Sequence, residues 1–244
     1  MDRLIKSLMV VEEDAPLGER AHHALRGAIV RCDFAPGAKL KVEALSEQYG
    51  FSSSPLREAL NRLAQEGLVQ SLENRGFRVA PISHAALHDL THMRLLLETD
   101  ALASAVGRGG DEWEARVVAA FHRLALIEQR LDLTGPLALN DDWSARHKAY
   151  HLALFSGCDS PLQLRTAEMF FVQAERYRRF SALHRKPARN KKSEHQALMN
   201  AALARKKELA VDLLREHIIK TTENVAAALD RMNLSDKDEA EAAA

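Results

Sequence analysis

The sequence contains little of what disulfide frameworks, β-rich folds and membrane spans require. Among 244 residues there are 2 cysteines, 11 glycines and 7 prolines, and only 5% are aromatic. Two cysteines, Cys32 and Cys158, cannot build a disulfide framework, which indicates a reducing, cytoplasmic location. No apolar run reaches the roughly 18 residues of a membrane span. P-loop, G-x-G-x-x-G and G-x-S-x-G motifs are also missing, which argues against the enzyme classes built on them.

An excess of charge of either sign is missing too. Lys plus Arg and Asp plus Glu both number 34, so the net charge predicts no polyanionic partner. Any nucleic-acid contact must therefore come from local clustering. The abundant residues are Ala, Leu, Glu and Arg, with 46% hydrophobic and 28% charged overall, which favours a mostly helical packed chain.

The chain changes character near residue 80. Pro81 disfavours helix at Ala80, and Ser83 is a suitable N-cap for a following helix. We expect a flexible N-terminus over 1–14, a first domain over 15–80, a second domain over 81–232 and a flexible tail over 233–244, because both ends are polar and carry no core-facing stripe.

The first domain combines short helices with a hairpin. Apolar periodicity predicts helices over 20–31, 42–49 and 52–66, the last ended by Gly67. Alternation over 68–72 and 77–80 predicts a β-hairpin around 73–76. This order is that of a winged helix-turn-helix.

The second domain is predicted to be an all-α helical bundle, which makes the fold mainly α. Gly- and Pro-rich breaks separate long amphipathic segments. The pattern predicts six helices, near 84–107, 111–132, 140–157, 161–184, 194–205 and 208–230.

Several motifs of the first domain resemble those of the N-terminal domain of GntR-family transcriptional regulators. They read LRGAI at 25–29, PGAKL at 36–40, LSEQYG at 45–50, SSSPLREAL at 52–60 and EGLV at 66–69. Two positions differ from many relatives. Cys32, just after the first helix, stands where those relatives have glycine, a residue suited to helix termination. Ser53 stands where they have arginine.

The resemblance implies a DNA-reading surface on the third helix and the hairpin. A recognition helix presents its N-terminal residues to base edges and phosphates, which suits short polar residues and an arginine. Similarity to the family implies that Ser52, Ser54 and Arg57 contact DNA, with Ser53 beside them, and that the tip of the wing enters the minor groove. That tip consists of Asn74, Arg75 and Gly76. The alternative for Arg57 is a solvated arginine or an ion pair within the domain.

The second domain resembles the FCD effector domain of FadR-like regulators, and six helices place it near the VanR-like group. The markers are RLLLE at 94–98, YH at 150–151, EH at 194–195 and EH at 216–217. The resemblance implies a small organic acid as effector. Family members with this constellation usually have Asp at the position of His147.

Four histidines lie on inward stripes of the predicted helices. His147 and His151 are one turn apart, whereas His195 and His217 would be about 33 Å apart on one straight helix. If the chain reverses near 205–208, His195 and His217 lie side by side on two antiparallel helices, because residue 206 is midway between them in the sequence. Converging imidazoles in a bundle core indicate a divalent metal, with nitrogen donors favouring Zn or Ni over Mn or Mg. A polar effector cavity without metal is the alternative.

Arg94 also occupies a core-facing position, where a charge is costly unless it is paired. A carboxylate effector and Glu98 are the two candidate partners. The basic run 176–192, which holds no acid, is expected to be a solvated helix end and loop.

Together these features predict a ligand-responsive DNA-binding regulator, with a repressor favoured. We expect a homodimer on a palindromic double-stranded operator, because one short recognition helix reads few base pairs. The competing hypothesis is a metal-dependent enzyme built on the four histidines, but no carboxylate accompanies them on their stripes to act as acid or base.

Overall fold

The computed structural model describes residues 14–73, 75–130, 139–184 and 192–242, with only the backbone for 192 and 232–242. The chain divides into two compact units, Met1–Ile82 and Ser83–Ala244, which are described separately. The expected flexible N-terminus, apart from Asp14, lies outside the described residues.

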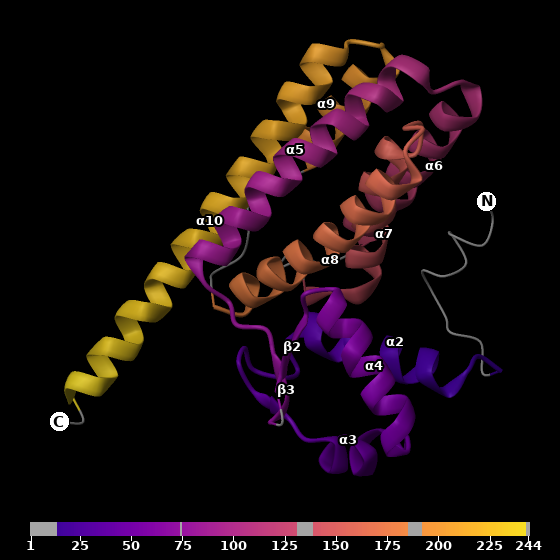
Figure 1. The fold of residues 1–244 in the computed structure, drawn as a ribbon. Coiled ribbons are helices and arrows are strands. Elements are labelled where there is room, and N and C mark those ends of the chain that lie inside the picture. Colours follow the sequence, from indigo (N-terminus) through magenta and orange to yellow (C-terminus); the bar gives the residue numbers. More distant parts are fainter. Residues whose placement is uncertain (1–13, 74, 131–138, 185–191, 243–244) are drawn as a thin grey trace. The chain divides into compact units, whose positions relative to one another are not determined.

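The first unit has the predicted winged helix-turn-helix order, with one strand added. Its elements are α2 (Leu17–Arg31), β1 (Lys39–Leu40), α3 (Val42–Tyr49), α4 (Ser53–Gln65), β2 (Val69–Leu72) and β3 (Gly76–Val79) (Figure 1). The strands form an antiparallel sheet in the order β1-β3-β2. The two-residue strand β1 was missed by the sequence analysis because it is too short for an alternation pattern.

Local sequence explains where these helices end. Gly67 takes the left-handed conformation (φ 73°) just after α4, and the amide of Leu68 donates to the carbonyl of Leu63 at 3.0 Å. Cys32 takes the same conformation after α2 (φ 65°), at the position where many relatives have glycine. The apolar stripes of α2 and α4 face each other and are buried: Ala21, Leu25, Ala28, Ile29, Leu56, Ala59, Leu60 and Leu63.

The described residues of the second unit contain helices joined by turns and no strand. Six helices lie in this described part: α5 (His84–Arg108), α6 (Asp111–Arg130), α7 (Asp141–Phe155), α8 (Pro161–Leu183), α9 (Lys192–Leu203) and α10 (Lys207–Ala242). The hydroxyl of Ser83 accepts the amide of Ala86 at 3.2 Å and caps α5, as predicted. The last helix continues to Ala242, beyond the predicted end near 230 and through much of the expected tail.

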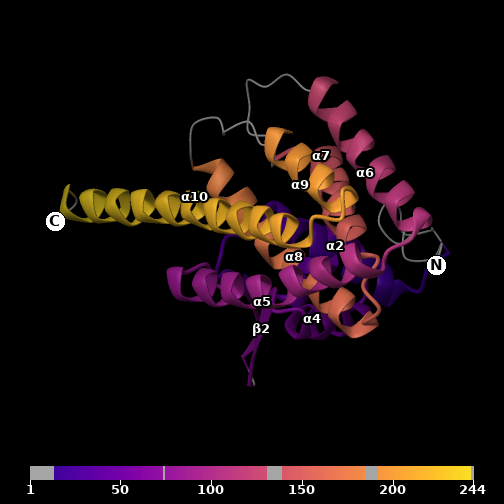
Figure 2. The same cartoon turned by 90° about the horizontal axis from the view of Figure 1, so that it is seen from above.

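Helices α5 and α10 lie antiparallel and side by side (Figures 1 and 2). His84 at the start of α5 pairs with Asp230 on α10 at 3.0 Å, and the hydroxyls of Thr91 and Thr222 are 2.8 Å apart about two turns further along. The apolar core lies between the helices, with Trp113, Tyr150 and Phe155 as its largest fully buried side chains. This packing brings α7, α8, α9 and α10 around a shared interior.

Candidate functional site

The N-terminal end of α4 presents the predicted DNA-reading residues to solvent. Ser52 is the extended N-cap residue, Ser53 and Ser54 begin the helix, and Arg57 follows one turn later. All four side chains are exposed. The first turn holds no acid, so the partial positive charge of the helix end is available to an anion such as a phosphate. Arg57 makes no ion pair with any residue that the structure describes.

The tip of the wing lies between β2 and β3. Arg75 and Gly76 are exposed there, and Gly76 has φ 82°, a conformation that favours glycine. Asn74, the third predicted contact of the wing, lies outside the described residues.

A carboxylate holds the far end of the recognition helix. Glu66 accepts Nε2 of His22 at 2.5 Å and Nε of Arg26 at 2.9 Å, which ties α2 to the residue after α4. Burial raises the pKa of Glu66, but the hydrogen bond with His22 and the charge of Arg26 outweigh it, so that the pKa lies below its ordinary value. The contacts of Glu66 with His22 and Arg26 therefore hold α4, the helix that carries Arg57, against α2.

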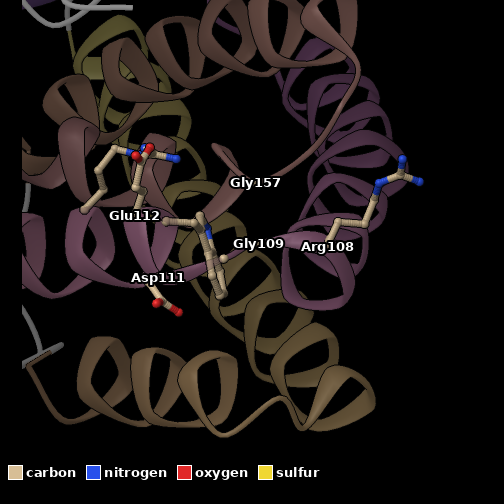
Figure 3. Close-up of a pocket in the computed structure, with 8 residues that line it drawn as sticks. Arg108, Gly109, Asp111, Glu112 and Gly157 are labelled. Carbon is tan, nitrogen blue, oxygen red and sulfur yellow. The ribbon is translucent and has the colours of Figure 1, made fainter.

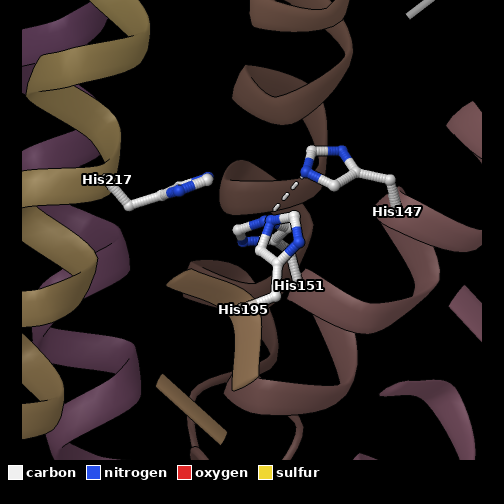
Figure 4. A group of neighbouring side chains, drawn as sticks. All are labelled: His147, His151, His195 and His217. Atoms are coloured by element: carbon white, nitrogen blue, oxygen red, sulfur yellow. Dashed lines mark hydrogen bonds between the residues drawn. The ribbon is translucent and has the colours of Figure 1, made fainter. Parts of the chain in front are cut away.

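The four predicted histidines converge in the interior of the second unit (Figure 4). His147 and His151 come from α7, His195 from α9 and His217 from α10, and none is more than 6% exposed. One ring nitrogen of each lies within 4.8 Å of the others. Nε2 of His147 and Nε2 of His151 are 3.2 Å apart. The structure therefore brings together the four histidines that the sequence analysis selected as candidate ligands.

The reversal between α9 and α10 sets the register of His195 and His217. Arg205 takes a left-handed conformation there (φ 58°), and its guanidinium donates to the carbonyl of Val106 at 2.8 Å and to Glu114 at 2.5 Å. The same guanidinium lies over the ring of Trp113, 4.9 Å from its centroid. These contacts fix the turn to α5 and α6.

Aromatic side chains enclose the histidines. Trp143 stacks on His147 with 4.5 Å between ring centroids, and Phe171 lies 5.5 Å from His147 and 5.4 Å from His151. The hydroxyl of Tyr150 donates to the carbonyl of His195 at 2.8 Å, and burial raises the pKa of this phenol. Such walls lower the local dielectric and keep bulk water away from the imidazoles.

One carboxylate belongs to this site, although the sequence analysis found none. Oε2 of Glu194, in the first turn of α9, lies 3.1 Å from Nδ1 of His217. Glu194 is on the edge of the inward stripe and half-buried, so helix periodicity gave no reason to select it. The signal that could have identified Glu194 was its position next to His195, in the EH pair that marks the family resemblance.

Arg94 is buried and paired with Glu98, the second of its two candidate partners. Nε and Nη2 of Arg94 donate to the two carboxylate oxygens at 2.6 and 3.0 Å. Arg94 also approaches the aromatic wall of the histidine site, with its Cζ atom 6.0 Å from the Phe171 centroid. A second guanidinium, that of Arg178, lies over the same ring, with its Cζ atom 4.5 Å from the centroid.

The basic run expected to be solvated is buried from Arg176 to Ala182, about two helical turns. Arg178 and Arg179 both donate to Glu175, and Ser144 donates to the same carboxylate at 2.5 Å. Burial raises the pKa of Glu175, but the charge of Arg178 and these hydrogen bonds lower it below its ordinary value. The prediction was wrong here because Glu175, just before the run, pairs with Arg178 and Arg179, and Asp141 on α7 also pairs with Arg179. Residues 185–191 of the run lie outside the described residues.

A separate hollow of about 550 Å³ lies at the junction of α5 and α6 (Figure 3). It is lined by Arg108, Gly109, Gly110, Asp111, Glu112, Trp113, Arg116 and Gly157. Arg108 pairs with Asp159 at 2.7 Å and Arg116 with Glu112 at 3.8 Å, and no histidine of the cluster borders the hollow. This hollow is therefore not the histidine site.

Comparison with known families decides what these units are. Residues 17–79 match the bacterial regulatory proteins of the gntR family, and residues 89–220 match the FCD domain. The chain belongs to the GntR family. It is a DNA-binding transcriptional regulator of the GntR/FCD type, as its motifs indicated.

Relatives of this GntR protein agree with that assignment. It is 42% identical to the HTH-type transcriptional regulator BphR of Paraburkholderia xenovorans, over 82% of this chain and 81% of BphR. It is 37% identical to the HTH-type transcriptional repressor GlaR of Escherichia coli, over 80% of this chain and 89% of GlaR. These relatives are regulators and not enzymes.

Solved structures share the fold of this GntR regulator. Escherichia coli McbR/YncC superposes with a TM-score of 0.71 at 22% identity, covering 89% of this chain and 99% of McbR. A GntR-type regulator from Rhodococcus sp. RHA1 superposes with a TM-score of 0.66 at 20% identity, covering 86% and 98%. Within the described residues, no helix is long and apolar enough to cross a membrane.

Proposed function

We propose that this protein is a ligand-responsive repressor whose second unit binds a divalent transition metal through His147, His151, His195 and His217. The observation that carries the proposal is the convergence of four buried imidazoles from three helices on one point. The metal in turn binds a small carboxylate, and occupation of that site changes the affinity of the first unit for its operator. The repressor role is supported by relatives named as repressors, such as GlaR.

The donor set fits a nitrogen-preferring metal. Tetrahedral Zn²⁺ with bonds of about 2.0–2.1 Å places its nitrogen ligands about 3.4 Å apart. The candidate nitrogens lie within 4.8 Å of one another, and Nε2 of His147 is 3.2 Å from Nε2 of His151, so small side-chain rotations suffice. Imidazole suits Zn and Ni, whereas Mn and Mg prefer oxygen ligands.

Charge supports a carboxylate as the effector. Four neutral imidazoles leave the double positive charge of the metal uncompensated, and an anionic ligand on an additional coordination position reduces it. The buried Arg94 is the residue that we propose the effector also reaches, sharing its guanidinium with Glu98. Phe171 neighbours both groups, with its ring centroid 6.0 Å from Cζ of Arg94 and 5.5 Å from the ring of His147, so a ligand that joins them would contact this ring.

Operator geometry supports a homodimer on palindromic DNA. The exposed end of α4 spans only the few residues from Ser52 to Arg57, and one such helix reads too few base pairs for useful specificity. Two copies on half-sites about one helical turn apart supply the rest.

The direct test measures metal and DNA together. Protein purified without a His-tag is analysed for Zn and Ni, and its operator affinity is measured with and without metal and a panel of small carboxylates. We expect one metal ion per chain, loss of that metal in His195→Ala and His217→Ala, and a change in DNA affinity on adding an effector. His122→Ala is the control, because His122 is exposed on α6. Protein that gains no metal and no thermal stability from Zn or Ni would overturn the metal site.

A further inference from the structure

The position of Glu194 assigns it a role in the histidine site that is distinct from metal ligation. Its carboxylate oxygen lies 3.1 Å from Nδ1 of His217, and the ring of His217 extends from α10 toward the other three histidines (Figure 4). An ionised carboxylate only accepts hydrogen bonds, so the partner nitrogen Nδ1 must carry the proton. In a neutral imidazole the lone pair is then on Nε2.

We propose that Glu194 is a positioning residue: it holds the Nδ1–H tautomer of His217, so that Nε2 is the metal ligand. This inference rests on the metal-binding function proposed above. A carboxylate behind a ligating histidine fixes its ring orientation and raises its basicity, and loss of such a partner typically costs 10–100-fold in metal affinity. The four ligands include no acid of their own, so Glu194 also supplies negative charge close to the metal.

The placement of Glu194 couples two helices. Its backbone neighbour His195 faces the cluster from the first turn of α9, while its side chain holds His217 on α10. The side chains of Glu194 and His217 are 24% and 7% exposed, so the hydrogen bond is shielded from competing water.

The matched control is Glu208, which is also an acid in the first turn of a helix but is 84% exposed in its side chain. Glu208→Gln removes the same helix-end charge without touching a histidine. Glu194→Gln keeps the volume of the side chain, and Glu194→Ala removes the acceptor altogether. Comparison of the three separates a general helix-end effect from the specific contact with His217.

Two measurements test the proposal. In metal-free protein labelled with ¹⁵N-histidine, long-range ¹H–¹⁵N spectra report the tautomer of His217, assigned by its loss in His217→Ala. We expect Nδ1–H in the parent protein and a shift toward Nε2–H in Glu194→Ala. An Nε2–H tautomer in the parent protein, or an unchanged tautomer in the variant, overturns the proposal.

The second measurement is Zn²⁺ affinity by chelator competition. We expect a loss of about 10–100-fold in Glu194→Gln and Glu194→Ala and less than twofold in Glu208→Gln. Equal affinities in all four proteins overturn the positioning role. If the parent protein binds no Zn²⁺, the metal function fails, and the tautomer measurement on metal-free protein still decides the role of Glu194.

Discussion

The rings of His195 and His217 lie 5.0 Å apart between centroids, although 22 positions separate the two residues in the sequence. The reversal at Arg205 brings them level on neighbouring helices, and contacts from Arg205 to Val106, Glu114 and Trp113 hold that turn. The geometry of the histidine site therefore depends on Arg205, a turn residue that is not itself one of the candidate ligands.

Arg57→Ala is expected to weaken specific operator binding by about 1–3 kcal/mol if Arg57 reads a base. The fold should not change, because the Arg57 side chain is exposed. Fluorescence anisotropy with operator DNA at several salt concentrations measures the effect, since phosphate contacts make binding fall steeply with salt. Arg62→Ala, an exposed arginine in the last turn of the same helix, is the charge-matched control. An unchanged affinity would remove Arg57 from the DNA surface.

Arg94→Met is expected to destabilise the protein by about 3–5 kcal/mol, because it leaves the fully buried Glu98 without its cation. Adding Glu98→Leu removes the uncompensated charge and should recover most of that loss. The double variant then isolates binding from folding. If Arg94 binds the effector, adding carboxylates no longer raises the unfolding temperature of the stably folded double variant. A response equal to that of the parent protein would make Arg94 purely structural.

His147→Asp is expected to shift metal preference toward Mn²⁺. The substitution replaces an imidazole with a carboxylate oxygen and adds one negative charge, which suits harder metals. It restores the residue that the family resemblance implies at this position. Elemental analysis after dialysis against equal Zn²⁺ and Mn²⁺ gives the ratio bound, with exposed His122→Asp as control. The interpretation is wrong if the Mn to Zn ratio stays at the parent value.

Glu66 is expected to make the stability of the first unit fall in acid. Its folded-state pKa is lower than its ordinary value near 4.5, so its contribution is present above that value and is lost as pH falls through the folded pKa. Glu66→Gln should therefore lower the unfolding temperature at pH 7 and have progressively less effect below pH about 4.5. Calorimetry of both proteins across this range gives the difference, and a difference independent of pH would contradict the assignment.

The sequence by itself predicted the two domains' elements closely. Apolar periodicity and Gly or Pro at the breaks gave the helices of both units to within a few residues, because these signals are local; the exception is the end of α10, which continues to Ala242. The same periodicity identified which histidines face inward, and the position of the reversal at 206 related His195 to His217. Family motifs identified Ser52–Ser54 and Arg57, which the fold then presents at the exposed end of α4.

Only the tertiary structure decided which partner each buried charge has. Periodicity predicts that Arg94 faces inward, but it does not decide whether Glu98 or a ligand compensates the charge of Arg94. The structure shows that Glu98 does. Glu175 neutralises Arg178 and Arg179, and Glu194 reaches His217 on another helix. Arg94 and Glu175 find these partners within their own helices, at i+3 or i+4, where local sequence allows a pair but does not select it over a ligand or solvent. The contact of Glu194 with His217 joins two helices and depends on the rotation and register with which they pack, which local sequence does not encode. Apolar periodicity predicts which residues of a helix are buried, whereas the packed neighbouring side chains decide which contacts those residues make.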